Sequence, residues 1–270
     1  MSITSFDRNQ SQSNTPETAP SAMSGGVVPG SLTAVASPGA LSLHPSPCGK
    51  TSNVRIGRHS IHLPVTLDPG PLYAPTKRAI DVFAAVALLI VLSPVFAVVA
   101  LLIFLEDRGP VFYYQTRVGK DGQHFLFYKF RSMVTRADLI RHQLETQNEA
   151  VGPIFKMKND PRITRVGRFI RRYSIDELPQ LFNVLRGEMS LVGPRPHLPR
   201  EVNYYTDPQK GRLAVQPGLL CLREILGRSN MTFEEWIELD LLYIRHRCLR
   251  TDLMILARTI PSILAADGAY

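Results

Sequence analysis

The chain has few cysteines, and its first residues contain no apolar run. Its three cysteines, Cys48, Cys221 and Cys248, show no CxxC spacing, so the sequence indicates neither a zinc site nor a disulfide framework. Free thiols are typical of a reducing compartment that faces the cytosol. Residues 1–19 contain no apolar run, so we expect no signal peptide. The sequence also lacks an internal repeat.

Acidic residues are outnumbered by basic ones. The chain of 270 residues carries 31 lysines and arginines against 23 aspartates and glutamates, a formal net charge of +8. Most of the excess follows residue 76. A basic surface suits nucleic acid, anionic lipid or a phosphorylated substrate, and net charge alone does not choose among them.

Order-promoting residues are scarce near the N-terminus. The stretch NQSQSNTPETAPSAMSGGVVPGS is rich in Ser, Thr, Pro and Gly, and such a composition buries too little apolar surface to fold. We therefore expect residues 1–70 to be a mostly disordered tail. At most, one short strand is expected within residues 53–67.

Residues 82–105 form an uncharged apolar run of 24 residues. As one helix it would measure about 36 Å, which is enough to cross a bilayer. Pro94 lies near its midpoint and supplies no N–H, so the carbonyl of Ile90 loses its helical partner. The hydroxyl of Ser93 is expected to bond the carbonyl of Leu89 and deepen the bend.

Each half of this run measures about 18 Å, less than the hydrocarbon core of about 30 Å. The run therefore fits either a kinked span or a helix–break–helix that enters and leaves through one leaflet. Positive charge flanks it on both sides, so the positive-inside bias gives no orientation.

Beyond the run, the pattern predicts a β-hairpin followed by helices. Aromatic-rich segments at residues 111–118 and 124–131 flank a turn at 119–122. Lys129 and Arg131 alternate with aromatic residues, so both cations can project from one face. Helices are expected within residues 135–148, 155–174, 232–247 and 250–264.

The last of these helices has an apolar stripe. Its members are Leu253, Leu256, Ile260 and Ile263. This stripe suits either the membrane surface or packing on the core, and the sequence does not decide between the two.

Two adjacent carboxylates, Asp176 and Glu177, open the stretch SIDELPQLFNVLRGEMSLVGPRP. Ser174 with Glu177 three residues later matches a capping box, which would give the pair a purely structural role. Pro179 is better placed as the first helical residue. In that case both carboxylates lie on the loop before the helix, beside N–H groups that attract anions.

Arginines surround this pair in the sequence, namely Arg171, Arg172, Arg186 and Arg195. Nearby positive charge is expected to lower a carboxylate pKa and keep the group ionised. Paired carboxylates with arginines suit Mg²⁺-assisted chemistry on a diphosphate. An ionised aspartate can also attack phosphorus and form an acyl phosphate. The motif GPRP holds Arg195 between two prolines. If Arg195 has no part in this chemistry, the motif is simply a turn.

Taken together, these motifs resemble one family. They are similar to motifs of the bacterial sugar transferases, which are monotopic polyprenyl-phosphate phosphoglycosyl transferases. The matching stretches are, in this order, KRAIDVFAAVALLIVLSPVFAVVALLI, FYKFRSM, NDPRITRVGRFIRRYSIDELPQLFNVLRGEMSLVGPRP and QPGL. The resemblance covers residue 77 to about residue 265. It implies transfer of a sugar 1-phosphate from a UDP-sugar to undecaprenyl phosphate, with release of UMP.

The resemblance also implies the architecture. We expect an α+β, mainly helical chain in which residues 77–105 form a re-entrant membrane hairpin. Ser93-Pro94 matches the family's helix break and favours insertion into one leaflet. Residues 106–270 would form a cytosolic catalytic domain at the bacterial inner membrane, with a β-hairpin and amphipathic interfacial helices.

Residue roles follow by the same resemblance. Asp176 matches the family's nucleophile and forms a covalent aspartyl intermediate, and Glu177 together with Asp176 would hold Mg²⁺. The expected phosphate contacts are Arg171, Lys129 and Arg131. The expected nucleotide contacts are Pro194, Arg195 and Pro196.

The expected partners are a UDP-sugar, undecaprenyl phosphate, the inner membrane and later glycosyltransferases of the same pathway, with no nucleic acid. The chain looks most like exopolysaccharide-initiating galactose or glucose phosphotransferases. Where members commonly read QPGLTGLWQVSGRN, residues 216–229 read QPGLLCLREILGRS, which places sugar choice or efficiency in question. The alternatives are a membrane-anchored glycosyltransferase that releases UDP and a non-enzymatic basic scaffold.

Overall fold

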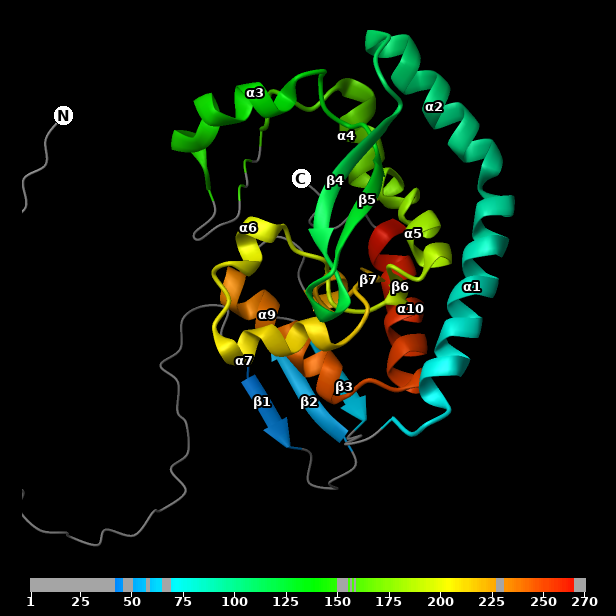
Figure 1. Ribbon diagram of the computed structural model, residues 1–270, viewed down its shortest axis with the longest axis vertical. Helices are drawn as coiled ribbons and strands as arrows, with labels where there is room; N and C mark the ends of the chain where they lie inside the picture. The colour runs from blue at the N-terminus through cyan, green and yellow to red at the C-terminus, as the bar shows by residue number, and fades with distance from the viewer. Residues whose placement is uncertain are drawn as a thin grey trace, which may run out of the picture. The chain divides into compact units, whose positions relative to one another are not determined.

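The computed structural model describes residues 42–45, 51–56, 59–64, 69–149, 155, 157, 159–226 and 231–264. All of them belong to one unit, Ala36–Tyr270. Helices predominate, and the strands are short (Figure 1). The predicted α+β, mainly helical class is confirmed. The first part of the expected tail lies outside the described residues.

A three-stranded antiparallel sheet lies inside the segment for which we expected little order. Its strands are β1 (Ser42–Pro45), β2 (Thr51–Ile56) and β3 (His59–Pro64), in that order. Ile61 and Leu63 of β3 are completely buried. Alternate residues of a strand share one face, so β3 has an apolar face that the low overall hydrophobicity of the tail conceals. The expectation of disorder to residue 70 does not hold for these strands.

Two helices, α1 (Tyr73–Val91) and α2 (Ser93–Asp107), meet at the predicted break. No single helix of the described residues is long and apolar enough to cross a membrane, whereas this pair reaches that length and composition together, bent by 60°. The Ser93 hydroxyl donates to the carbonyl of Ile90 at 2.8 Å, not to that of Leu89. It thus replaces the N–H that Pro94 cannot supply.

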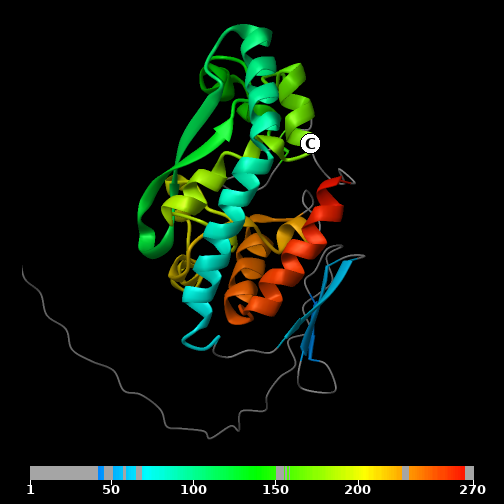
Figure 2. The ribbon, with the colours of Figure 1, turned by 90° about the vertical axis from the view of Figure 1, so that its right-hand side faces the viewer.

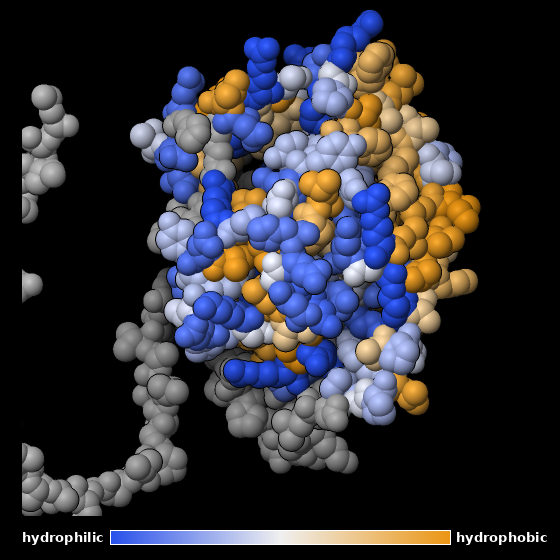
Figure 3. Space-filling model, viewed as in Figure 1, coloured by the Kyte–Doolittle hydropathy of each residue, from blue (hydrophilic) through white to orange (hydrophobic). Residues whose placement is uncertain are grey.

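The helix pair runs along one side of the unit (Figure 2), where the space-filling view shows a broad apolar surface (Figure 3). Phe83, Ile90, Val98 and Leu101 are all more than half exposed, Phe83 to 78%. Monomeric soluble proteins rarely expose contiguous apolar patches of this kind unless the patch meets a membrane or a partner.

The polar start of α1 is fastened inside the protein. The Lys77 ammonium lies 3.0 Å from Asp252, and the Arg78 guanidinium donates to the carbonyl of Leu185 at 2.8 Å. Buried Asp81 accepts from the backbone N–H of Leu191 at 3.1 Å. These contacts fix one end of the helix pair to residues 185, 191 and 252, which lie far along the chain.

The β-hairpin is confirmed as β4 (Phe112–Val118) and β5 (His124–Phe130), which pair antiparallel. After it come α3 (Ala137–Arg141), α4 (Arg165–Arg172), α5 (Gln180–Arg186), β6 (Ser190–Val192), α6 (Pro199–Val202) and α7 (Asp207–Lys210). The remaining elements are β7 (Gly218–Leu220), α8 (Arg223–Leu226), α9 (Phe233–Arg245) and α10 (Leu249–Leu264).

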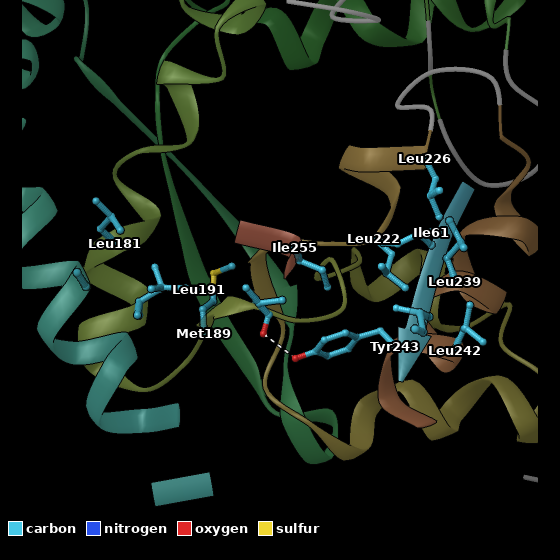
Figure 4. Close-up of a cluster of buried hydrophobic side chains, with 14 of the residues drawn as sticks. Ile61, Leu181, Met189, Leu191, Leu222, Leu226, Leu239, Leu242, Tyr243 and Ile255 are labelled. Carbon is cyan, nitrogen blue, oxygen red and sulfur yellow. Dashed lines mark hydrogen bonds between the residues drawn. The ribbon is translucent and has the colours of Figure 1, made fainter. Parts of the chain in front are cut away.

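The main core gathers α5, β6, α8, α9 and α10 against β3 (Figure 4). At its centre the Tyr243 hydroxyl donates to the carbonyl of Val192 at 3.2 Å. On α10 the buried residues are Thr251, Asp252, Ile255 and Thr259, whereas Leu253 and Ile260 of the predicted stripe are each 58% exposed. Leu256 of the same stripe is partly buried and packs against the main core, so the stripe is divided between the core and the surface.

The motif GPRP directly follows β6, and QPGL leads into β7; the two strands pair in parallel. Gly193 N–H donates to the Leu220 carbonyl at 3.0 Å, and Gly218 N–H donates to the Pro194 carbonyl at 2.8 Å. A Cβ on Gly218 would lie 2.0 Å from the Gly193 nitrogen. Glycine is required here because the two backbones approach each other so closely.

We expect Gly218→Ala to lower the free energy of unfolding by about 3 kcal/mol or more, because the added methyl group meets backbone that cannot yield. Urea unfolding measures the change. Gly211→Ala is the matched control, since a Cβ there meets only the Leu241 side chain at 3.5 Å. Equal midpoints for the two variants would contradict the close-approach argument.

Candidate active site

Asp176 and Glu177 lie in a single 3-10 turn, Ile175–Glu177, between α4 and α5. Ser174 has φ of 54° and its side chain caps no N–H, so the predicted capping box is absent. An N-cap residue needs extended backbone, which the left-handed Ser174 does not have. Pro179 precedes the first residue of α5, so both carboxylates lie before the helix, as the proline indicated.

The two carboxylates are held very differently. The Lys129 ammonium lies 2.8 Å from Glu177 Oε1 and 3.4 Å from Asp176 Oδ2. Arg195 grips Glu177 with both terminal nitrogens, at 2.6 Å and 3.3 Å. Among the described residues, Lys129 is the one hydrogen-bond or ion-pair partner of the Asp176 side chain. Glu177 is therefore clamped, and Asp176 is nearly free.

The pKa values of the two carboxylates also shift in opposite directions. Burial raises the pKa of Asp176, the like charge of Glu177 adds to this effect, and Lys129 offsets it only in part. Burial also acts on Glu177, but the charges of Arg195 and Lys129 hold its pKa well below the ordinary value. The expectation of a lowered pKa is thus correct for Glu177 and wrong for Asp176.

Two arginines, buried Arg212 and partly buried Arg117, hold the backbone around Arg195. The Arg195 carbonyl accepts from the Arg212 guanidinium at 2.7 Å, and the Pro196 carbonyl accepts from Arg117 at 3.1 Å. Arg212 is itself ion-paired with buried Asp240. The arginine between two prolines is therefore more than part of a turn, because its peptide groups are fixed from two sides.

A cleft of about 960 Å³ opens over the carboxylates, a size suited to a nucleotide-sugar ligand. Its lining includes most of the predicted site residues, namely Lys129, Arg131, Arg171, Asp176, Glu177, Arg195 and Pro196. Pro194 is not among the lining residues, and its carbonyl accepts a hydrogen bond from the Gly218 N–H. Arg131 is buried and ion-paired with Asp107, so its charge is already matched.

The cleft also contains arginines that the sequence did not single out. Arg136 and Arg200 line it and are exposed. Together with Arg171, they have no ion pair within the described part of the chain. Unpaired guanidinium groups are suited to bind phosphate. The sequence analysis did not predict Arg136 or Arg200 as site residues, because neither lies in a recognisable motif.

Two arginines near the carboxylates in sequence contact aromatic rings and do not line the cleft. Arg186 sits 5.0 Å from the centre of the Tyr128 ring, and Arg172 sits 5.9 Å from that of Tyr173. Sequence proximity therefore overestimated the positive charge around the pair.

The carboxylate pair fits a hard divalent cation in its chemistry. Mg²⁺ takes oxygen ligands, usually one or two carboxylates together with substrate phosphates and waters. Asp176 supplies a carboxylate with a single ionic partner. No cluster of three or more His, Cys, Asp or Glu side chains suited to a metal occurs in the described ranges. The remaining ligands would thus come from substrate and water.

Comparison with known proteins agrees with this geometry. The family model described as bacterial sugar transferase matches residues 72–266, which include the helix pair, the carboxylates and the cleft. This chain belongs to that family. The three strands β1–β3 precede the matched segment.

Three relatives are 38–43% identical to this chain over the aligned residues. Galactosyl transferase CpsE of Streptococcus agalactiae serotype III is 43% identical over 194 residues, which cover 72% of this chain and 43% of that protein. The undecaprenyl-phosphate galactose phosphotransferase of Salmonella typhimurium is 41% identical over 204 residues, or 72% and 41% of the two proteins. Exopolysaccharide production protein ExoY of Sinorhizobium fredii is 38% identical over 204 residues, or 74% and 90%. The chain thus spans less than half the length of the first two relatives.

We expect Glu177→Gln to lower the pKa of Asp176. The substitution removes a like charge and leaves Lys129 to Asp176 alone, and both effects favour the ionised aspartate. Carboxyl ¹³C NMR of aspartate-labelled protein measures the titration. Glu238→Gln, at an exposed glutamate of α9, is the control. An unchanged or higher pKa of Asp176 would contradict the electrostatic assignment.

Proposed function

We propose that this protein transfers a sugar 1-phosphate from a UDP-sugar to undecaprenyl phosphate and releases UMP. Family membership supports this, as do relatives named undecaprenyl-phosphate galactose, glucose and N-acetylgalactosamine phosphotransferases, from Salmonella typhimurium, Komagataeibacter xylinus and Aeromonas hydrophila. The observation that carries the proposal is the unequal pairing of the carboxylates. A nearly free carboxylate beside a clamped one separates a nucleophile from a binding group.

In the first step, a carboxylate oxygen of Asp176 attacks the phosphorus that bears the sugar. The bond from that phosphorus to the bridging oxygen breaks, and UMP leaves with that oxygen and its electron pair. The product on the protein is an acyl phosphate that carries the sugar. The weak pairing of Asp176 suits this role. Few partners stabilise the charge of its carboxylate, so an oxygen of that carboxylate is available to form the new bond.

In the second step, a phosphate oxygen of undecaprenyl phosphate attacks the same phosphorus. The bond between Asp176 and phosphorus breaks, which restores the carboxylate and gives a sugar linked to undecaprenyl diphosphate. Lys129, Arg171 and Arg195 line the cleft, and they balance negative charge as it moves between the two phosphates.

Asp176 and Glu177 would hold Mg²⁺, which when bound offsets charge on the phosphate oxygens. Glu177 contributes through its permanent ionisation, because Arg195 and Lys129 hold its pKa well below the ordinary value. Arg195 therefore acts on the reaction by keeping a neighbouring carboxylate charged as well as by its own charge.

The lipid acceptor gives the helix pair its role. The 60° bend between α1 and α2 and the exposed apolar side chains of both helices support a re-entrant hairpin in one leaflet. Such an anchor holds the cleft at the membrane surface, where a soluble sugar nucleotide meets the phosphate of a lipid. The proposed location is the inner membrane, with the cleft on the cytosolic side.

Asp176→Asn is expected to abolish UMP release from UDP-sugars in the presence of Mg²⁺ and undecaprenyl phosphate, because the amide cannot form the acyl phosphate. A panel of UDP-sugars, with the nucleotide product identified by chromatography, measures this and identifies the sugar. Asp121→Asn, at an exposed residue of the hairpin turn, should keep wild-type turnover. Release of UDP would instead indicate transfer of the sugar alone, and an active Asp176→Asn variant would remove the nucleophile assignment.

Phe83→Asp with Ile90→Asp should reduce the fraction of protein retained in carbonate-washed membranes. Each charge placed among lipid chains costs about 3 kcal/mol, whereas neither side chain packs in the protein interior. Leu139→Asp is the matched control, because Leu139 is 68% exposed on α3, outside the helix pair.

Tags at residues 1 and 270 should both react only from the cytosolic side. A periplasmic N-terminal tag would favour a kinked span.

A further inference from the structure

The β1–β3 sheet has no counterpart in the matched family segment, yet it enters the main core. The match begins at residue 72, and β3 ends at Pro64. Ile61 and Leu63 are nonetheless fully buried and belong to the same core cluster as Leu222 and Leu226. An addition to the family domain thus contributes two of the least exposed side chains in the described residues.

The sheet meets the core at α8. β3 contacts α8 and α10, and Figure 4 shows Ile61 beside Leu222, Leu226 and Leu239. Helix α8 has only four residues. A helix this short has no stability of its own in water, so its position depends on what packs against it.

Helix α8 carries side chains that reach the catalytic cleft. Glu224 Oε1 lies 3.3 Å from the Arg223 guanidinium and 3.9 Å from that of Arg195. Arg195 thus lies between two carboxylates, Glu177 on one side and Glu224 on the other. The Arg223 guanidinium also lies 4.3 Å from the centre of the Trp236 ring. Both Arg223 and Glu224 line the cleft.

We propose that the β1–β3 sheet is a positioning element for the active site. It holds α8 in place, and α8 sets the Arg195 guanidinium through Glu224, so that Arg195 keeps its two-nitrogen grip on Glu177. Ile61, Leu63 and Glu224 are positioning residues, because they act on the reaction through Arg195. The kinetic consequence rests on the proposed function, whereas the structural consequence does not.

The single tryptophan of the chain, Trp236, reports the position of α8 without any assay of activity. In the full-length protein, Ile61→Ala with Leu63→Ala opens a cavity beneath α8. We expect a shifted Trp236 emission maximum and a larger acrylamide quenching constant, since Arg223 no longer covers the ring. Arg223→Met calibrates the loss of that contact. If the double variant does not fold, Ile61→Val takes its place. This substitution removes only one methyl group, and we expect a smaller shift in the same direction.

The control is Ile103→Ala on α2. Ile103 is buried in a separate cluster with Val99, Phe130 and Ile170, which lacks α8. Compared under conditions in which both variants are folded, as judged by urea unfolding, this variant should leave the Trp236 emission unchanged. An equal shift in Ile103→Ala, or no shift in the β3 variants, would overturn the proposal.

The kinetic test is a double-mutant cycle on UMP release. The β3 substitutions should change kcat and KM for the UDP-sugar in the wild-type background, and they should have no further effect in Glu224→Gln, because the route to Arg195 is already cut. Full additivity would overturn the route through Glu224. If the wild-type chain releases no UMP, the proposed function fails, and the fluorescence measurement alone decides whether the sheet positions α8.

Discussion

The close backbone approach of Gly193 and Gly218 is the constraint on which the active site depends. It joins two motifs that lie more than twenty residues apart and leaves no space for a side chain at Gly218. The strand pair β6–β7 then presents Arg195 at its end, and Arg212 and Arg117 fix the peptide groups on either side. A guanidinium held this way loses little conformational entropy when it binds a charged group.

That fixed guanidinium makes two neighbouring carboxylates unlike each other. Both are taken out of water, which penalises the charged form of each. Arg195 and Lys129 repay this cost for Glu177, and Asp176 receives only the longer contact to Lys129. The buried charges are therefore unevenly compensated, which is a common feature of sites that do chemistry.

The bend between α1 and α2 depends on a separate interaction. Pro94 breaks the backbone ladder, and the neighbouring Ser93 hydroxyl takes the carbonyl that this break leaves free. The bend therefore leaves no unpaired polar group at Ile90, which matters in surroundings without water. The first turns of α1 are tied by Lys77, Arg78 and Asp81 to α10, α5 and β6. The apolar surface and the cleft are thus held in one fixed relation.

The sequence by itself determined the parts that depend on neighbouring residues. The hairpin follows from alternating aromatic residues around a turn, the bend from Ser93-Pro94, and the position of the carboxylates before α5 from Pro179. The motifs that match the sugar transferase family also pointed to Asp176, Glu177, Lys129 and Arg195 together.

Only the tertiary structure decided what depends on distant residues. It showed which arginines share the cleft with the carboxylates, that Asp176 and Glu177 differ in pKa, and that β3 packs on α8. Charge–charge interactions fall off with distance in space rather than along the chain, and Arg186, which is close to the carboxylates in sequence, does not line the cleft. Burial likewise depends on every packed neighbour, and for this reason two apolar residues in a polar tail could join the core unnoticed.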